Sequence, residues 1–260
     1  MASDARYPIR VEGDLDPGLT RWLWLLKWIL VIPHYIVLFF LWIAFFVLTV
    51  VAFVAILVTE RYPRGIFDFN VGVIRWSWRV HFYSYGALAT DRYPPFTLSA
   101  DVDYPARLDV AYPQRLSRGL VLVKWWILAI PHYLVVSIFT SGGITFVQAG
   151  EPGSPLNGAP PEEWWSMSYG AGLIGLLVFF VAIALLFTGR YPRGIFALIV
   201  GLHRWALRVV AYATLMTDTY PPFRLEQGGR EPAGPDQAAS PESGSDTTPP
   251  AAPGADHSSA

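Results

Sequence analysis

An almost unbroken apolar run over residues 19–59 dominates the first quarter of the chain. Between Lys27 and Glu60 the only ionisable side chains are His34 and Tyr35. A single helix of this length would measure about 60 Å, whereas the hydrocarbon core of a bilayer is about 30 Å thick. The run therefore predicts two membrane spans of about 20 residues each.

The same order of motifs occurs twice, so the chain is a tandem duplication. A segment ending in IPHY, an RYPRGIF segment and a YPPF segment follow one another at 27–35, 61–67 and 90–98, and again at 124–133, 190–196 and 217–225. We predict a first membrane repeat over 1–100 and a second over 101–226. Residues 227–260 are acidic and rich in Pro, Gly, Ser and Ala, a composition that predicts a disordered tail.

The second copy carries a polar insert, residues 141–168, where the first copy has Leu41 and Trp42. Such a loop cannot lie inside the hydrocarbon, because its backbone polar groups would lack hydrogen-bond partners. The chain is therefore expected to turn there, at the membrane surface. Each copy then becomes a helical hairpin, 20–40 with 42–60 and 117–139 with 170–188. The alternative for the first copy is an in-plane helix to Ile32, broken at Pro33, followed by one span.

The distribution of charge predicts the orientation. Residues 141–168 contain three Glu and neither Lys nor Arg, whereas all 19 basic residues lie elsewhere. Positive charge stays on the cytoplasmic side of a membrane. We therefore expect a multi-pass protein of the inner (plasma) membrane, with residues 141–168 as an external loop and both termini in the cytoplasm.

A second kind of helix is expected after each hairpin, over 65–88 and 194–216. Its arginines, Arg75 and Arg79 in the first copy and Arg204 and Arg208 in the second, fall on one helical stripe. The helix can lie in the cytoplasmic interface or cross the membrane with this stripe inside a bundle. An Arg at the bilayer centre costs about 2.5–3.5 kcal/mol, which favours the in-plane position.

The predicted fold class is an all-α integral membrane protein. It is a tandem repeat of a transmembrane helical hairpin plus an amphipathic interfacial helix. Short cytoplasmic strand segments are expected within 6–14, 96–110 and 222–226. Because each copy has an even number of spans, both copies keep one orientation and are related by an axis along the membrane normal.

The combination VEGDLDPGLTRWLWLLKWILVIPHYIVLFF, RYPRGIFDFNVGVIRWSWRV and TDRYPPFTL resembles the bacterial membrane family catalogued as domain of unknown function 4389. The resemblance covers both copies, although the second has DVAYPQR in place of the EGDLDPG turn. It implies an integral membrane protein and supplies no activity and no catalytic residues.

Four side chains form a candidate intramembrane polar site: His34 and Tyr35 in the first copy, and His132 and Tyr133 in the second. An ionisable residue inside a membrane is a functional hypothesis by default, and His can relay protons or ligate a metal. The alternative is a purely structural role. Pro frees backbone carbonyls one turn earlier, and His or Tyr hydrogen-bonds to them and fixes a kink in the helix. Two His without a carboxylate do not make a closed metal site, so no metal is predicted.

Basic side chains form a second candidate set, for contact with anionic lipid headgroups. Lys27 and Lys124 are expected to extend to the inner headgroups. Guanidinium groups can bind lipid phosphates, or they can simply set the topology. The arginines of this set are Arg64, Arg75, Arg79, Arg193, Arg204 and Arg208.

Patterns for catalysis are absent from the sequence. It has no GxSxG, Walker or HExxH motif, no Gly-rich nucleotide fingerprint and no cysteine. No cofactor and no nucleic acid is predicted as a partner. The leading hypothesis is a non-enzymatic scaffold or lipid-associating protein, whose tail could recruit a protein partner. The alternative is a small transporter or channel-like protein with its path between the repeats, and an enzyme comes third.

Overall fold

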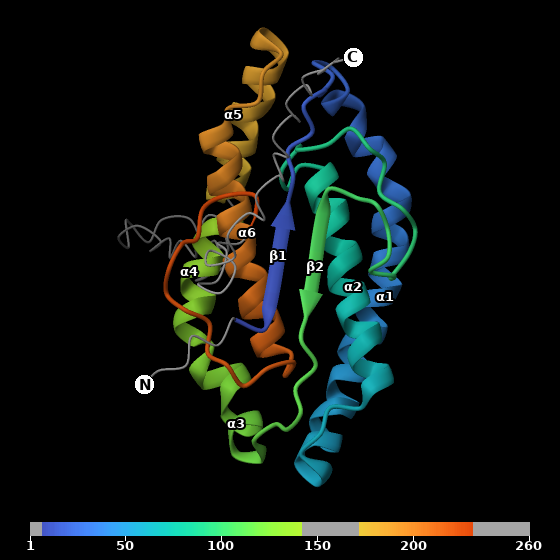
Figure 1. The fold of residues 1–260 in the computed structure, drawn as a ribbon, viewed down its shortest axis with the longest axis vertical. Coiled ribbons are helices and arrows are strands. Elements are labelled where there is room, and N and C mark those ends of the chain that lie inside the picture. Colours follow the sequence, from blue (N-terminus) through green and yellow to red (C-terminus); the bar gives the residue numbers. More distant parts are fainter. Residues whose placement is uncertain (1–6, 142–171, 231–260) are drawn as a thin grey trace, which may run out of the picture. The chain divides into compact units, whose positions relative to one another are not determined.

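The computed structural model describes residues 7–141 and 172–230, and most of these residues are helical (Figure 1). The elements of the first copy are β1 (Ile9–Gly13), α1 (Trp24–Thr59) and α2 (Arg64–Tyr83). Those of the second are β2 (Ala106–Val110), α3 (Arg118–Val123), the π-helical turn η1 (Lys124–Leu128), α4 (Ile130–Ser141), α5 (Leu173–Thr188) and α6 (Arg193–Ala213).

The first apolar run is one continuous helix, so the predicted hairpin of 20–40 with 42–60 is wrong. Helix α1 extends for 36 residues and contains Pro33 without breaking. Residues 40–44, FLWIA, contain neither Gly nor Pro to favour a turn. Near Pro33, the Tyr93 hydroxyl donates a 3.0 Å hydrogen bond to the carbonyl of Leu30, which helps to satisfy the backbone around the proline.

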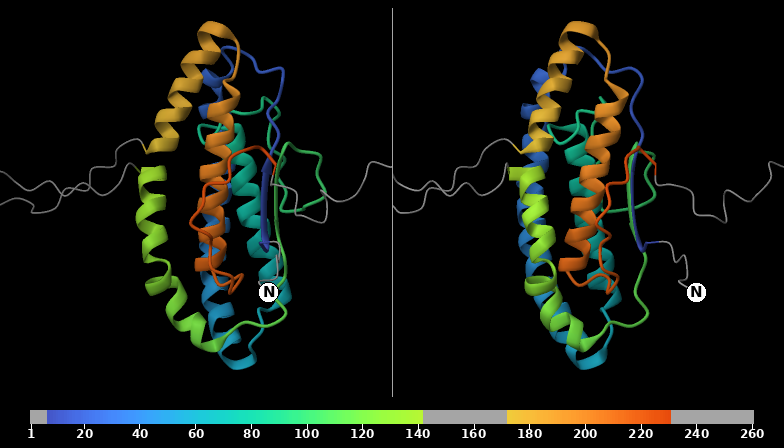
Figure 2. Two further views of the ribbon diagram at one scale, coloured as in Figure 1. Left: turned by 60° about the vertical axis from the view of Figure 1, so that its left-hand side comes forward. Right: turned by 90° about the vertical axis from the view of Figure 1, so that its left-hand side faces the viewer.

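The second copy builds an equivalent of α1 from four pieces: α3, η1, α4 and α5. Helix α1 is called the first rod, and these four elements together are called the second rod. A bend of 44° separates α3 and η1 from α4, and Figure 2 shows α5 continuing in the direction of α4. A side-chain carbon at Gly172 would meet the carbonyl oxygens of Phe139 and Thr140, so the chain leaves the rod and rejoins it at one point. The hairpin predicted for 117–139 with 170–188 is therefore also wrong. The predicted external loop, residues 141–168, lies outside the described residues except for Ser141.

A sharp turn joins each rod to an inner helix. Glu60 and Gly189 end the two rods in the left-handed conformation, with φ angles of 58° and 66°. The following Pro63 and Pro192 are the N-caps of α2 and α6. The repeated RYPRG sequence thus turns the chain back along the rod that it has just completed.

The inner helices α2 and α6 are largely buried, contrary to the prediction of helices lying on a membrane surface. Figure 2 shows them between the rods on one side and the two strands on the other. Trp78, Arg79 and Arg204 are among the largest fully buried side chains of the chain. The arginine stripe predicted from the sequence exists, but it faces protein.

A two-stranded antiparallel sheet connects the copies. The central pair of the register is Val11 opposite Leu108. Short strands within 6–14 and 96–110 are thus confirmed, whereas residues 222–226 are not a strand. Antiparallel strands at the centre of a duplication imply an approximate twofold axis perpendicular to the sheet, with the two rods running in opposite directions. Residues 7–231 form one compact unit that contains both copies.

Helices long and apolar enough to cross a membrane occur in the described part of the chain. By length and composition they are α1 and α6, with the bent pair formed by α3–η1 and α4 as a third. Their existence supports the predicted membrane character, but the four spans of the two predicted hairpins are not found among residues 7–141 and 172–230.

Candidate functional site

The first IPHY motif is held by the YPPF segment of its own copy. His34 is buried, and its Nδ1 accepts a 3.1 Å hydrogen bond from the indole N–H of Trp76. The Phe96 ring stacks on the imidazole with a centroid distance of 4.0 Å, and Tyr93 lies against it at 4.9 Å. Because Nδ1 accepts a hydrogen bond from the indole N–H, the imidazole is neutral and carries its own proton on Nε2.

The second IPHY motif repeats this geometry with different partners along the chain. Trp205 donates to Nδ1 of the buried His132 at 3.2 Å. Phe223 stacks on the ring at 4.1 Å, and Tyr220 lies at 4.9 Å. The same arrangement occurs in both copies, and in each the histidine packs the YPPF segment against the rod.

The tyrosines of the IPHY motifs do not join the histidines in a shared site. Tyr35 and Tyr133 are 46% and 41% exposed. The Tyr35 hydroxyl lies 3.4 Å from Oγ of Ser84, and that of Tyr133 donates to the carbonyl of Trp125 at 2.7 Å. The predicted polar site is thus two separate docking points, and the hydroxyls reach a neighbouring helix end and their own rod.

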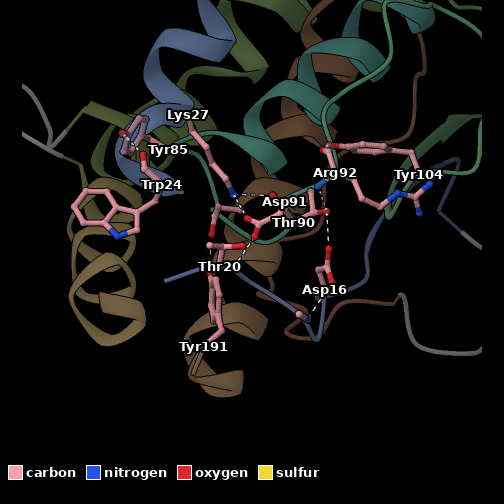
Figure 3. A network of polar contacts seen from close by, with 12 residues as sticks. Asp16, Thr20, Trp24, Lys27, Tyr85, Thr90, Asp91, Arg92, Tyr104 and Tyr191 are labelled. Atoms are coloured by element: carbon pink, nitrogen blue, oxygen red, sulfur yellow. Dashed lines mark hydrogen bonds and ion pairs between the residues drawn. The ribbon is translucent and has the colours of Figure 1, made fainter. Parts of the chain in front are cut away.

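Two buried lysines make ion pairs with the TD dipeptides that precede the YPPF sequences. The Lys27 ammonium lies 2.9 Å from the Asp91 carboxylate and 2.7 Å from the carbonyl of Thr90, as Figure 3 shows. Lys124 makes the same contacts with Asp218, at 2.8 Å, and with Thr217, at 3.0 Å.

In the structure these lysines therefore face protein partners, which differs from the predicted extension to lipid headgroups. Lys27 and Lys124 are only 1% and 0% exposed. A buried ammonium needs a carboxylate, and breaking such a pair by removing one partner costs about 3–5 kcal/mol.

The same carboxylates organise the start of each rod. Asp91 accepts the backbone N–H of Thr20 at 2.6 Å, and Asp218 accepts that of Ser117 at 2.6 Å. Each aspartate thus neutralises a lysine and also binds a backbone N–H group just before its rod begins. Burial, together with nearby Asp91, raises the pKa of Tyr83 to about 12, so the phenol beside Lys27 stays neutral.

The π-helical turn η1 explains how the second copy keeps both contacts. Six positions separate Lys27 from Pro33, but seven separate Lys124 from Pro131. A π-turn accommodates one extra residue within a helix. The extra residue is absorbed at η1, so that Lys124 still reaches Asp218 and His132 still reaches Trp205.

The buried arginines of the inner helices bind backbone carbonyls. Arg75 donates to Leu108 at 2.8 Å, and Arg204 donates to Val11 at 3.0 Å, so the two arginines reach the paired central residues of the sheet. Arg79 donates to Ser99 at 2.8 Å.

Arg208 pairs with Glu226 at 2.8 Å. Burial alone would raise the pKa of Glu226, but Arg208 and Arg224 together lower it below its ordinary value. Arg79, Arg204 and Arg208 are at most 3% exposed, so in the structure they face protein, which differs from the predicted contact with lipid headgroups.

Of the predicted lipid-contacting arginines, Arg64 and Arg193 remain at the surface. Each follows the proline that begins an inner helix, beside the end of a rod. They are joined there by further exposed arginines that the prediction did not include: Arg21, Arg61, Arg118 and Arg190.

The rods present a continuous apolar surface. Along α1, Leu25, Ile36, Val47 and Val58 recur every 11 residues, which is about three helical turns, and they are 48% to 69% exposed. Large exposed apolar side chains continue along η1, α4 and α5. Soluble monomers rarely expose an apolar patch of more than a few hundred Å², and larger ones mark membrane or protein contact surfaces.

The arrangement explains why the repeated motifs occur together. Within residues 7–141 and 172–230, no group of three His, Asp or Glu side chains could hold a metal ion. The two histidines and the two lysines were predictable from the sequence, but their partners were not identified there. These partners are Trp76, Asp91 and Phe96, and Trp205, Asp218 and Phe223. Their recurrence at matching places in both copies was the available signal.

Comparison with known proteins agrees with the duplication. The model of the family described as Domain of unknown function (DUF4389) matches residues 21–97 and 165–224, one segment in each copy and together more than half of the 260 residues. No curated protein and no solved structure matches the chain. The matched segments carry the IPHY motif of the first copy and the RYPRGIF and YPPF motifs of both. The chain belongs to the DUF4389 family.

Proposed function

We propose that this protein is a non-enzymatic, lipid-associating membrane protein whose two rods lie in the plane of the bilayer, within one leaflet. The observation that carries the proposal is the layered arrangement: an apolar surface along the rods on one side, and a charged sheet parallel to it on the other (Figure 2). A membrane surface has the same asymmetry.

The length of α1 favours the in-plane position. Its 36 residues make a rod of about 54 Å. To fit into a hydrocarbon core of about 30 Å, the rod would have to tilt by about 56°, beyond the usual range of about 0–40°. A helix lying flat is about 10 Å across and fits within one leaflet, whose hydrocarbon is about 15 Å deep.

The charged sheet argues in the same direction. Its outer face carries Arg107, which pairs with Glu12 at 3.8 Å and with Asp14 at 2.6 Å, and Asp109, which pairs with Arg75 at 3.3 Å. The strands run beside the middle of the helices in both views of Figure 2. If the rods crossed the membrane, these charges would lie at the depth of the hydrocarbon, where they are costly.

Arginine at both ends of each rod fits a single membrane surface. Arg21 and Arg61 flank α1, and Arg118 and Arg190 flank the second rod. Upright rods running in opposite directions would place the identical RYPRGIF motifs on opposite sides of the membrane, against the positive-inside tendency. Flat rods place all four arginines at one headgroup layer, and we assign it to the cytoplasmic leaflet.

The transporter alternative loses its main support. It required His34 and His132 to face a path between the repeats, yet both are buried, stacked on aromatic rings and bonded to tryptophan. A protein partner for the tail stays a prediction, because residues 231–260 lie outside the described part of the chain.

Labelling of single cysteines at the two ends of α1 tests the proposal. The chain has no native cysteine, so Arg21→Cys and Arg61→Cys each give one reactive thiol. An impermeant thiol reagent is applied to intact cells and to inverted membrane vesicles. Flat rods predict that both positions react in inverted vesicles only. Asp109→Cys on the exposed sheet is the matched control and should react in the same preparation.

Reaction of one end of α1 in intact cells and of the other in inverted vesicles would contradict the proposal. It would establish that the rod crosses the bilayer.

A further inference from the structure

The two ends of the molecule are built from equivalent arginines. At one end of the molecule, the C-terminal end of α1 meets the start of the second rod. Arg61, Arg64 and Arg118 lie at this junction. At the other end the close of α5 meets the start of α1. By the alignment of the repeats, Arg190, Arg193 and Arg21 occupy the corresponding positions there. A side-chain carbon at Gly189 would lie 2.5 Å from Nε of Arg21, so this arginine does lie against the second turn.

At the C-terminal end of α1, nearby carboxylates neutralise most of the arginine charge. Glu60 pairs with Arg118 at 3.2 Å, across the junction between the copies. Asp68 lies one helical turn after Arg64 and pairs with it at 3.6 Å. Two of the three guanidinium groups therefore have a carboxylate partner.

The end at the close of α5 lacks both carboxylates. Gly189 stands at the position of Glu60, and Ala197 at the position of Asp68. Arg21, Arg190 and Arg193 are exposed. No ion pair joins any of the three to another residue of 7–141 or 172–230. Two acidic groups around the start of α1 have other partners: Asp91 binds Lys27, and Asp16 accepts from Thr90.

We propose that Arg21, Arg190 and Arg193 form a binding site for the phosphate of an anionic lipid headgroup, and that the opposite end does not bind one. Guanidinium groups match phosphate oxygens in charge and in hydrogen-bond geometry. The site lies at the end of two apolar rods, so acyl chains can lie against the rods while the phosphate meets the arginines. This inference deepens the proposed lipid association by giving it one specific place.

An exchange of acidic residues between the two ends tests the site. Gly189→Glu with Ala197→Asp gives the α5 end the carboxylates of the α1 end and lowers its charge from three to one. Glu60 shows that Glu can adopt the left-handed backbone of position 189. The new side-chain carbon would lie 2.5 Å from Nε of Arg21, so the flexible end of that side chain must shift to admit it. The reciprocal variant, Glu60→Gly with Asp68→Ala, exposes the arginines of the α1 end.

The measurement is titration of the purified full chain, in a non-ionic detergent, with short-chain phosphatidylglycerol. Parallel titrations use short-chain phosphatidylcholine and inorganic phosphate. We expect one site for phosphatidylglycerol on the unaltered chain, with binding by the other two compounds at least about tenfold weaker. Gly189→Glu/Ala197→Asp should weaken binding by about tenfold or more, and Glu60→Gly/Asp68→Ala should raise the stoichiometry from one to two.

Three results would overturn the inference: unchanged affinity in Gly189→Glu/Ala197→Asp, no second site in the reciprocal variant, or binding of inorganic phosphate as tight as that of the lipid. Because the reciprocal variant removes side chains and gains binding, misfolding cannot imitate its expected result. Detergent titration does not depend on how the rods lie in a bilayer. Its failure is therefore distinguishable from failure of the in-plane proposal.

Discussion

At the residue scale, the repeated motifs are the two halves of one docking contact. IPHY supplies a histidine on a rod, and YPPF supplies the aromatic rings that cover it. The sequence singled out His34 because an ionisable group in an apolar helix is unusual. It did not reveal the role of this residue, because the partner Trp76 lies 42 positions further along the chain.

Loss of the imidazole acceptor should destabilise the protein. His34→Leu leaves the buried indole N–H of Trp76 without a partner, which costs about 1–3 kcal/mol. Trp76→Phe in the same chain should recover part of this loss, because neither partner then remains unsatisfied. The measurement is chemical unfolding in detergent for both single variants and the double variant.

Tyr35→Phe is the matched control, since its hydroxyl is partly exposed and its contact with Ser84 is long. It should change the unfolding free energy by less than about 0.5 kcal/mol. Equal losses for Tyr35→Phe and His34→Leu would show that the histidine has no special part in holding the YPPF segment.

The type and spacing of the arginines predict which helix face they share, but not what they bind. The stripe of Arg75 and Arg79 was predictable from helical spacing, but its partner was not. A guanidinium group can donate to lipid phosphates or to backbone carbonyls, and only the fold brings the carbonyls of Leu108 and Ser99 within reach.

At the element scale, the rods are where interpretation of the sequence failed. The polar insert predicts a turn at the membrane surface. Because the chain leaves and rejoins the second rod at one point, the insertion is compatible with a rod that continues on both sides. The duplication, the helical content and the short strands were predictable from local patterns. The direction of α5 depends on tertiary contacts, which those patterns do not contain.

The π-helical turn η1 leads to a prediction about the effect of shortening the second rod by one residue. Deleting Trp126 restores the six-position spacing of the first copy, so η1 should become α-helical while Lys124 and His132 keep their partners. We expect the melting temperature to change by no more than a few degrees, because about 1 kcal/mol shifts it by about 2–4 °C in a chain of this size. Circular dichroism during heating is the measurement.

Deleting Trp28 on the first rod is the matched control. This residue is also exposed, and it directly follows Lys27 in the sequence, as Trp125 directly follows Lys124. The first rod has no extra residue to lose, so either Lys27 or His34 must leave its partners. This deletion should destabilise the protein far more than deletion of Trp126. Equal effects would contradict the view that η1 absorbs one residue.

At the scale of the whole molecule, the proposed position in the membrane follows from duplication and layering together. An axis along the membrane normal was expected for two hairpins of upright helices. The same axis results from two flat rods running in opposite directions, with the sheet above them. Predicted symmetry can therefore survive although the predicted helix orientation changes, because both arrangements place equivalent charges at one surface.

The depth of α1 in a bilayer tests this account most directly. Spin labels attached to single cysteines at Leu25, Ile36, Val47 and Val58 sample one exposed face of the rod at intervals of about 16 Å. Their depths follow from relative accessibility to oxygen and to a water-soluble nickel chelate in reconstituted vesicles. A flat rod predicts four depths that agree within about 5 Å, half a helix diameter. A steady change of about 9 Å or more from each label to the next would mean that the rod crosses the membrane, and would contradict the account.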